Sequence, residues 1–262
     1  MASAIIGGLL KSGFVPDQIC VVEPFEAQQQ KLQTDFGVQV VSQPGTGLTG
    51  VDLVVWAVKP QTFKEAALAS AAHVRHALHL SVAAGIRADS IAAWLGLPAD
   101  QARVVRAMPN TPALVGLGMS GLYPMPAVTA ADRERIEQVM APTGQHVWFG
   151  QEVQLDAVTA MSGSGPAYVF FFIEAMQEAG VQMGLSAEQS RQLAIQTFIG
   201  ASELARASTD SPQELRAKVT SKGGTTYAAI TAMEAAGMKA SFIHALEAAQ
   251  HRAKELGDEF GK

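Results

Sequence analysis

VDLVVWAVKP, residues 51–60, is the stretch that decides the fold of this chain. Its apolar residues fall on both faces of an extended chain, which is typical of a strand inside a parallel sheet with helices on each side. Pro60 ends the strand, and apolar residues at helical spacing follow over residues 61–72. A strand followed directly by a helix is the repeating unit of α/β sheets. We therefore expect this stretch to be one strand of such a sheet.

The same alternation continues on both sides of this stretch. Further strands are expected at residues 18–22, 38–41, 77–82, 103–108 and 145–149. Helices are expected at residues 27–36 and 87–95, and Thr129 with Asp132 has the spacing of a capping box. Successive β-α-β units of this kind predict a doubly wound, Rossmann-like sheet.

After Gly150 the strand signals stop and helix signals take over. Ser164-Gly165-Pro166 places a proline where a helix begins. Two more capping boxes are predicted, Ser186 with Gln189 and Ser211 with Glu214. No tract rich in proline, serine or charge separates the halves. The sequence thus predicts an α/β dinucleotide-binding domain over residues 1–150 and an all-helical domain over residues 151–262.

Residues 1–12, MASAIIGGLLKS, look like the first helix of a dinucleotide fold, because the next strand ends at the acidic residue Glu23. No strand precedes this helix, and only Ala2 matches the glycine-rich turn that binds a pyrophosphate. A lost central strand would orphan buried backbone groups at about 1 to 3 kcal/mol each. We hypothesise that the true start lies upstream and that Met1 is an internal methionine, which the preceding codons would test.

Short turns with small residues follow three of the expected strands. They contain Ala57, Val58, Lys59 and Pro60 in the first, Ala83, Ala84 and Gly85 in the second, and Asn110 in the third, MPNTP. Open α/β sheets bind ligands at the carboxyl ends of their strands, where small residues let a planar ring approach the backbone. Taken singly, each turn also fits ordinary turn chemistry. Together they favour a nucleotide-binding crevice.

Glu23 is suited to hydrogen-bond an adenosine ribose hydroxyl. Its charge opposes a 2′-phosphate, and the nearest basic residue after it is Lys31, so this argument alone favours NADH. A solvated acid at a strand end is the alternative interpretation.

The loop VTSKGGTTY, residues 219–227, leads into an alanine-rich helix. The free N–H groups and positive end of a helix N-terminus can bind a carboxylate without an arginine. Gly223 and Gly224 allow close approach, while Ser221, Thr225 and Thr226 supply hydroxyl groups. A plain N-cap would need only one hydroxyl. We therefore expect a carboxylate-binding site here.

Composition excludes several classes of protein. The net charge of −5, without a dense basic run, argues against nucleic acid as a partner. The longest apolar stretch is too short for a membrane helix and no signal-peptide pattern is present, so we expect a cytoplasmic protein. Cys20, the only cysteine, is expected to be a buried thiol. His73, His76 and His79 cannot share one helical face, so no metal site is expected.

Five segments taken together resemble pyrroline-5-carboxylate reductases. They are AVKP (57–60), SVAAG (81–85), MPNTP (108–112), DAVTAMSGSGPAY (156–168) and VTSKGGTT (219–226). The order and separation of these segments are specific, and the resemblance covers essentially the whole chain. It departs from the family at the absent first strand and glycine-rich turn.

The resemblance implies reduction of L-1-pyrroline-5-carboxylate to L-proline, the last step of proline biosynthesis, with NADPH or NADH. It implies that AVKP and AAG line the nicotinamide and its ribose. By the same resemblance Ser221, Gly224, Thr225 and Thr226 bind the substrate carboxylate and ring nitrogen, with Thr226 catalytic. It also implies a homodimer interlocked through the helical domain, commonly assembled into rings of dimers.

Two other interpretations differ in what they require. A β-hydroxyacid dehydrogenase needs a catalytic lysine on the interdomain helix, and residues 164–178 contain none. A chain that truly starts at Met1 would fit an oligomeric scaffold without cofactor, which nucleotide titration would reveal.

Overall fold

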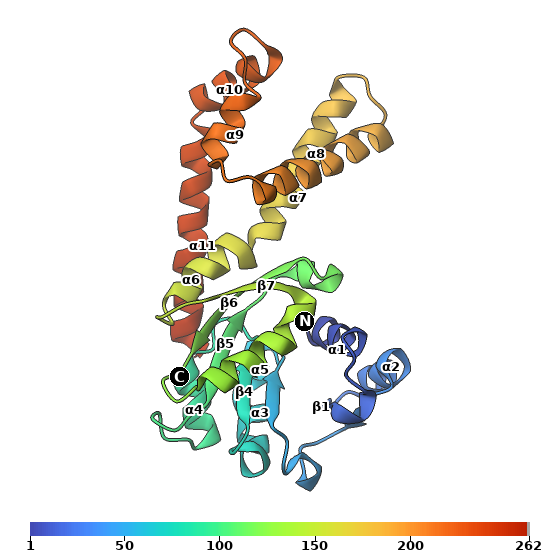
Figure 1. The fold of residues 1–262 in the computed structure, drawn as a ribbon, viewed down its shortest axis with the longest axis vertical. Helices are drawn as coiled ribbons and strands as arrows, with labels where there is room; N and C mark the ends of the chain where they lie inside the picture. The colour runs from blue at the N-terminus through green and yellow to red at the C-terminus, as the bar shows by residue number, and fades with distance from the viewer. Residues whose placement is uncertain (261–262) are drawn as a thin grey trace. The chain divides into compact units, whose positions relative to one another are not determined.

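The computed structural model describes residues 1–260 and divides into two compact units. One unit comprises Met1–Ser164 with Ala249–Lys262, and the other comprises Gly165–Ala248 (Figure 1). In the described part of the chain, every strand belongs to the first unit, and no strand follows Trp148. The prediction of an α/β half followed by a helical half is confirmed.

The strands of the first unit alternate with helices along the chain. The strands are β1 (Cys20–Val22), β2 (Gln39–Val41), β3 (Leu53–Trp56), β4 (Leu78–Ser81), β5 (Val104–Met108), β6 (Gly118–Pro124) and β7 (Gly144–Trp148). The α-helices are α1 (Ala2–Lys11), α2 (Glu26–Phe36), α3 (Pro60–Val74), α4 (Ala88–Leu95), α5 (Ala130–Met140) and α6 (Gln154–Val158). Short 3-10 turns lie at Pro16–Gln18, Thr46–Leu48, Thr111–Val115 and Ala141–Thr143, and a π-helical segment lies at Thr159–Gly163.

Five strands form the main sheet in the order β3-β4-β5-β6-β7. Strands β3, β4 and β5 are parallel, whereas β6 runs antiparallel to β5 and β7 runs parallel to β6. The sequence did not predict β6, because Gly118, Gly121 and Pro124 dilute its apolar pattern. A Cβ at Gly118 would lie 2.6 Å from the Thr143 carbonyl oxygen, so tight packing rather than strand propensity selects glycine there.

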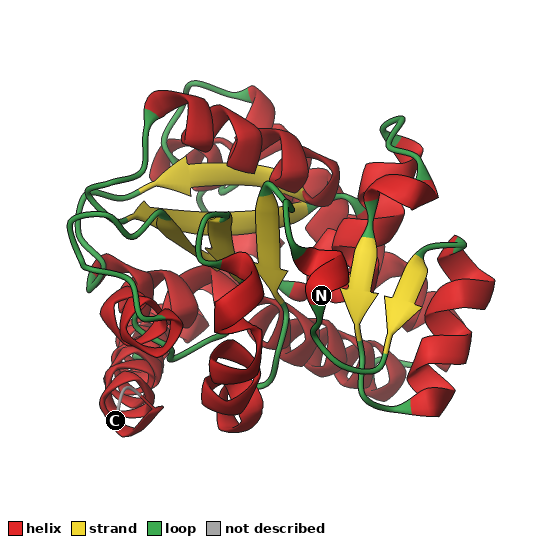
Figure 2. Cartoon of the chain, turned by 90° about the horizontal axis from the view of Figure 1, so that it is seen from below, coloured by secondary structure: helices red, strands yellow, loops and turns green. Residues whose placement is uncertain are grey.

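Strands β1 and β2 form a separate parallel pair that is not hydrogen-bonded to β3 (Figure 2). Helix α1 packs against both sheets, because Ile5 belongs to the core of the larger sheet and Ile6 to that of the smaller one. Within the described residues the strands therefore form two separate sheets. Cys20 is exposed, contrary to the expectation of a buried thiol, because β1 has a partner strand on one side only and alternates outward-facing residues.

Helices cover both faces of the main sheet. On one face Trp56 and Val104 pack against α3 and α4, with Phe63 and Ile91 fully buried. On the other face apolar residues of β3, β4 and β5 pack against α1 and α5. Burial on both faces explains why the strand at residues 51–60 is apolar on each side.

The second unit is helical and holds α7 (Gly165–Gln182), α8 (Ala187–Ala207), α9 (Pro212–Lys218), α10 (Thr225–Ala235) and the first part of α11 (Met238–Phe260). The capping boxes predicted at Ser186 and Ser211 are present, as is that at Thr129 in the first unit. Helices α7 and α8 approach so closely that a Cβ at Gly180 would lie 2.5 Å from Ser190 Oγ. None of the helices within residues 1–260 combines the length and apolar character needed to cross a membrane.

Candidate active site

Three of the predicted ligand-binding turns lie at one edge of the main sheet. The parallel register aligns Trp56 of β3 with Ser81 of β4, and Ser81 with Arg106 of β5. The turns that follow these strands therefore meet at the same carboxyl edge, as the sequence predicted. Ala57, Lys59 and Ala84 are exposed in the first two turns. In the third turn Asn110 is half-buried and Thr111 is exposed, so each turn presents at least one residue to solvent.

The AAG turn between β4 and α4 packs against Ser81 and α11. Ala83 is buried, and its N–H donates to Ser81 Oγ at 3.3 Å. Gly85 has φ +74°, a conformation that favours glycine, and a Cβ there would lie 3.2 Å from the Phe260 ring of α11. The backbone conformation and the packing against Phe260 therefore both favour glycine at position 85. Ala84 is the exposed tip of the turn.

Asn110 joins three segments behind the same edge. Its Nδ2 donates to the Ser162 carbonyl at 3.1 Å, and its Oδ1 accepts from the Met119 N–H at 2.9 Å. Ser162 belongs to the π-helical segment, a feature that often marks functional sites. The asparagine side chain therefore fixes the start of β6 and this segment to the end of β5.

Glu23 follows β1 and stabilises its own turn. Its Oε1 accepts from the Phe25 N–H at 3.0 Å, and its backbone carbonyl accepts from Gln29 Nε2. Within residues 1–260 its Oε2 accepts no hydrogen bond, which leaves one carboxylate oxygen available for a ribose hydroxyl.

Four charged side chains form a cluster at the start of α4, next to the AAG turn. They are Arg87, Arg106, Glu152 and Asp156. Arg87 forms a two-point ion pair with Asp156, with N–O distances of 2.9 and 3.2 Å. Arg106 donates to Glu152 Oε1 at 2.7 Å, and the same oxygen accepts from the Ala88 N–H at 2.7 Å. We call these residues the ionic cluster. The sequence did not predict this cluster, although an arginine inside the apolar strand RVVRAM indicates a buried partner.

Burial and charge oppose each other in the ionic cluster. Burial lowers the pKa of Arg106, and Glu152 only partly offsets this effect. Burial also acts to lower the pKa of Arg87, but the hydrogen bonds and charge of Asp156 outweigh it and raise that pKa. Each arginine is therefore paired with a carboxylate from the segment around α6, which offsets part of the free-energy cost of burying its charge.

The loop at residues 219–227 belongs to the second unit and connects α9 to α10. Gly224 is the N-cap of α10 and makes no side-chain capping bond, while Thr225 and Thr226 are the first two residues of the helix. Gly223 has φ +78°, which favours glycine. Within the described residues, the hydroxyl groups of Ser221, Thr225 and Thr226 have no hydrogen-bond partner, whereas Thr220 Oγ1 donates to the Arg216 carbonyl. The loop thus presents free N–H and hydroxyl groups at one helix end.

One ion pair joins the two helices that flank this loop, and a second joins α9 to the segment before it. Arg216 of α9 pairs with Glu234 of α10 at 3.4 Å, and Lys218 pairs with Asp210. The loop is therefore bracketed by α9 and α10, and Lys222 is the cation that remains without an ion pair in the described chain between residues 216 and 227.

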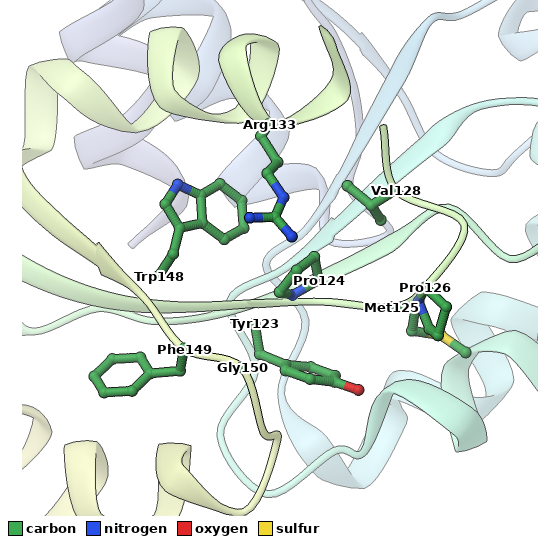
Figure 3. A pocket seen from close by; sticks show the side chains of 9 residues that line it. All are labelled: Tyr123, Pro124, Met125, Pro126, Val128, Arg133, Trp148, Phe149 and Gly150. Atoms are coloured by element: carbon green, nitrogen blue, oxygen red, sulfur yellow. The ribbon is translucent and has the colours of Figure 1, made fainter. Parts of the chain in front are cut away.

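A pocket of about 360 Å³ lies in the first unit (Figure 3). It is lined by Tyr123, Pro124, Met125, Pro126, Val128, Arg133, Trp148, Phe149 and Gly150. The guanidinium of Arg133 stacks over the Trp148 ring at 5.1 Å. Because β6 runs antiparallel to β5, Pro124 lies beside Val105, toward the amino end of that strand, so the pocket is not part of the carboxyl edge. It contains none of the predicted site residues.

The residues at the carboxyl edge fit one half of a dinucleotide better than the other. The small residues and exposed backbone of the AVKP and AAG turns suit a planar ring and its ribose. For the pyrophosphate, residues 1–260 offer the amino end of α1, whose N-cap Met1 makes no side-chain bond, and no glycine-rich turn. In the described chain no group of three or more His, Cys, Asp or Glu side chains is placed to hold a metal ion.

Comparison with known proteins gives a consistent result over the whole chain. Residues 152–256 match the family model for pyrroline-5-carboxylate reductase dimerisation, and residues 1–85 match that for coenzyme F420-dependent NADP oxidoreductases. A pyrroline-5-carboxylate reductase of Pseudomonas aeruginosa is 43% identical over 100% of this chain and 95% of its own length.

Solved structures agree with these matches. A pyrroline-5-carboxylate reductase of Coxiella burnetii has a TM-score of 0.89 and 38% identity, covering 97% of this chain and 94% of that one. The Plasmodium falciparum pyrroline carboxylate reductase, solved with NADP bound, has a TM-score of 0.85 and 27% identity over the same shares of the two chains.

Proposed function

The chain belongs to the pyrroline-5-carboxylate reductase family, and we propose that its two regions divide the reaction of that family between them. The protein is an NAD(P)H-dependent oxidoreductase that reduces L-1-pyrroline-5-carboxylate to L-proline, the last step of proline biosynthesis. In this proposal residues 1–150 bind the nicotinamide nucleotide and residues 151–262 bind the substrate and form the homodimer. The single observation that carries the proposal is the α10 end with its unpartnered hydroxyl and N–H groups.

The carboxylate of the substrate binds at the amino end of α10. The free N–H groups of the first helical turn and the hydroxyls of Ser221 and Thr225 donate hydrogen bonds to it, and the positive end of the helix favours its charge. Gly223 and Gly224 let the carboxylate approach the backbone. A small cyclic imino acid is thereby oriented without an arginine.

Thr226 acts at the ring nitrogen. A protonated cyclic imine is already electrophilic, so the site needs to position it rather than supply a strong acid. The half-buried Thr226 hydroxyl hydrogen-bonds the ring nitrogen and holds its proton in place. This role explains why the loop contains no histidine or aspartate.

The nicotinamide nucleotide supplies the hydride when it is bound. The nicotinamide and its ribose are held by the AVKP turn and by Ala83, Ala84 and Gly85. Asn110 fixes the neighbouring segments of the sheet edge through its two side-chain hydrogen bonds. The free carboxylate oxygen of Glu23 is assigned to the adenosine ribose. NADP is the nucleotide found in the Plasmodium falciparum structure. The reaction draws on a nucleotide pool inside the cell, and we assign the protein to the cytoplasm on that basis.

Thr226→Ala tests the assignment. We expect kcat/KM for pyrroline-5-carboxylate to fall about 100-fold, because the ring nitrogen loses its hydrogen-bonding partner. The melting temperature and nucleotide affinity are expected to stay unchanged. Thr197→Ala is the matched control, since that hydroxyl lies on α8 of the same unit and already donates to the Leu193 carbonyl. Equal kinetics for both variants would remove Thr226 from the mechanism.

A further inference from the structure

The first turn of α4 is attached to segments that are distant in the sequence. Arg87, the N-cap residue of α4, makes no capping bond through its side chain to that helix. The first N–H of the helix, at Ala88, is instead bound by Glu152, which is 64 residues away in the sequence. The position of this turn is therefore set by other segments of the first unit.

The ionic cluster provides two of these attachments. The Arg87 and Asp156 side chains are 18% and 8% exposed, and those of Arg106 and Glu152 are 5% and 21% exposed. A two-point guanidinium–carboxylate pair fixes the angle as well as the distance between its partners. The cluster thus joins Arg87, two residues after Gly85, to α6, and it joins the first N–H of α4 to β5.

Helix α11 also packs against this region. A Cβ at Gly257 would lie 2.7 Å from a guanidinium nitrogen of Arg87, and a Cβ at Gly85 would lie 3.4 Å from Leu256. Ala253 of the same helix is buried. Gly85 and Arg87 therefore both lie against α11, while Ala84 remains exposed.

We propose that Arg87 and Asp156 are positioning residues for the reductase reaction, which hold the AAG turn where it binds the nicotinamide nucleotide. This inference rests on the proposed role of that turn. Buried ion pairs contribute little net stability compared with apolar packing, so their geometric precision is the property that a binding turn uses. Neither residue touches the nucleotide in this proposal.

Asp156→Asn tests the inference. We expect the KM for the nicotinamide nucleotide to rise roughly 10-fold, because a small displacement of the turn misplaces the ring. The KM for pyrroline-5-carboxylate is expected to stay within twofold. Arg87→Lys keeps the charge but loses the two-point pairing, and it is expected to show the same nucleotide effect even if Asp156→Asn folds poorly.

Asp132→Asn is the matched control, because Asp132 is also a buried carboxylate paired with an arginine, Arg103, but lies at the start of α5. It is expected to lower the melting temperature without changing the nucleotide KM. If Asp156→Asn and Arg87→Lys behave like this control, the inference is wrong.

Ala84→Leu separates this inference from the proposed function. It places a larger side chain at the exposed tip of the turn and is expected to raise the nucleotide KM. An unchanged KM in Ala84→Leu would overturn the role of the turn itself. A raised KM there, with no effect in Asp156→Asn or Arg87→Lys, would overturn the positioning role alone.

Discussion

The two units of this protein bury their apolar residues in different ways. Nearly all the buried apolar side chains belong to the first unit, whereas Ala194 is the one buried apolar residue of Gly165–Ala248. In the second unit large apolar side chains remain exposed, including three in succession on α7, Val169, Phe170 and Phe171. A helical unit without a core of its own needs another surface to cover it.

The family match explains what covers the second unit. The dimerisation model spans residues 152–256, so we infer that a second copy of the chain covers these side chains. Obligate dimer interfaces of this kind resemble a domain core cut in half. Substitutions in the first unit should therefore change the stability of the folded chain, whereas substitutions of exposed apolar residues in the second unit should change dimerisation.

The largest expected effect tests the interface directly. Phe170→Ser with Phe171→Ser removes two side chains that are 63% and 65% exposed in the single chain. Burial of two such rings contributes about 3 kcal/mol or more, so the dimer dissociation constant should rise at least roughly 100-fold. Sedimentation velocity over a dilution series measures this change.

Leu68→Ser is the control for the double variant. Leu68 lies on α3 of the first unit and is 56% exposed, so its chemistry and exposure are comparable. The dimer should be unaffected by that change. If the double variant stays dimeric at the dilution where the native protein does, α7 does not carry the interface.

The second prediction concerns His79 in the core of the first unit. His79 is fully buried on β4, its Nδ1 accepts from Trp56 Nε1 at 3.2 Å, and its Nε2 has no partner in the described chain. Burial, followed by the charges of Arg103 and His76, lowers its pKa to about 4. Between about pH 6.5 and pH 4 the unfolded chain therefore binds a proton that the folded protein does not.

The free energy of unfolding should fall as the pH drops through this window, by up to about 3 kcal/mol. Urea unfolding at pH 7 and at intervals down to pH 4 measures the slope. His79→Gln retains an acceptor for Trp56 without a group that titrates there, and its slope should be flatter. An identical slope in the variant would show that other groups govern acid stability.

The smallest expected effect compares two glycines of the second unit. Gly180→Ala should destabilise the α7–α8 pair by roughly 1 to 2 kcal/mol, because the added Cβ meets Ser190 at 2.5 Å. A Cβ added at Gly200 on α8 would have no atom within 4 Å, so Gly200→Ala should stabilise the helix by up to about 1 kcal/mol. Thermal melting of both variants provides the measurement. Destabilisation by Gly200→Ala would show that a second chain packs against that position.

The sequence predicted those elements whose signal is local. The strands at 51–60 and 103–108 were recognisable because parallel strands are apolar on both faces, and the helix starts at Ser186 and Ser211 because capping boxes have a fixed spacing. Strand β6 was not recognisable, because its glycines are selected by contacts with distant residues such as Thr143 and Val158. Cys20 was misjudged for a related reason, since its exposure depends on which strands pair with β1.

The candidate site also combines features that are local in the sequence with features that depend on distant residues. The sequence by itself determined the family, the three turns at one sheet edge and the hydroxyl-rich loop at residues 219–227, because each is a contiguous segment with its own chemistry. Only the tertiary structure decided that Asn110 is bonded to Ser162 and Met119, and that Arg87 and Arg106 pair with Asp156 and Glu152. Except for Asn110 and Met119, the partners in these contacts are separated by 46 to 69 positions in the sequence. Their geometry therefore depends on how the sheet and helices pack.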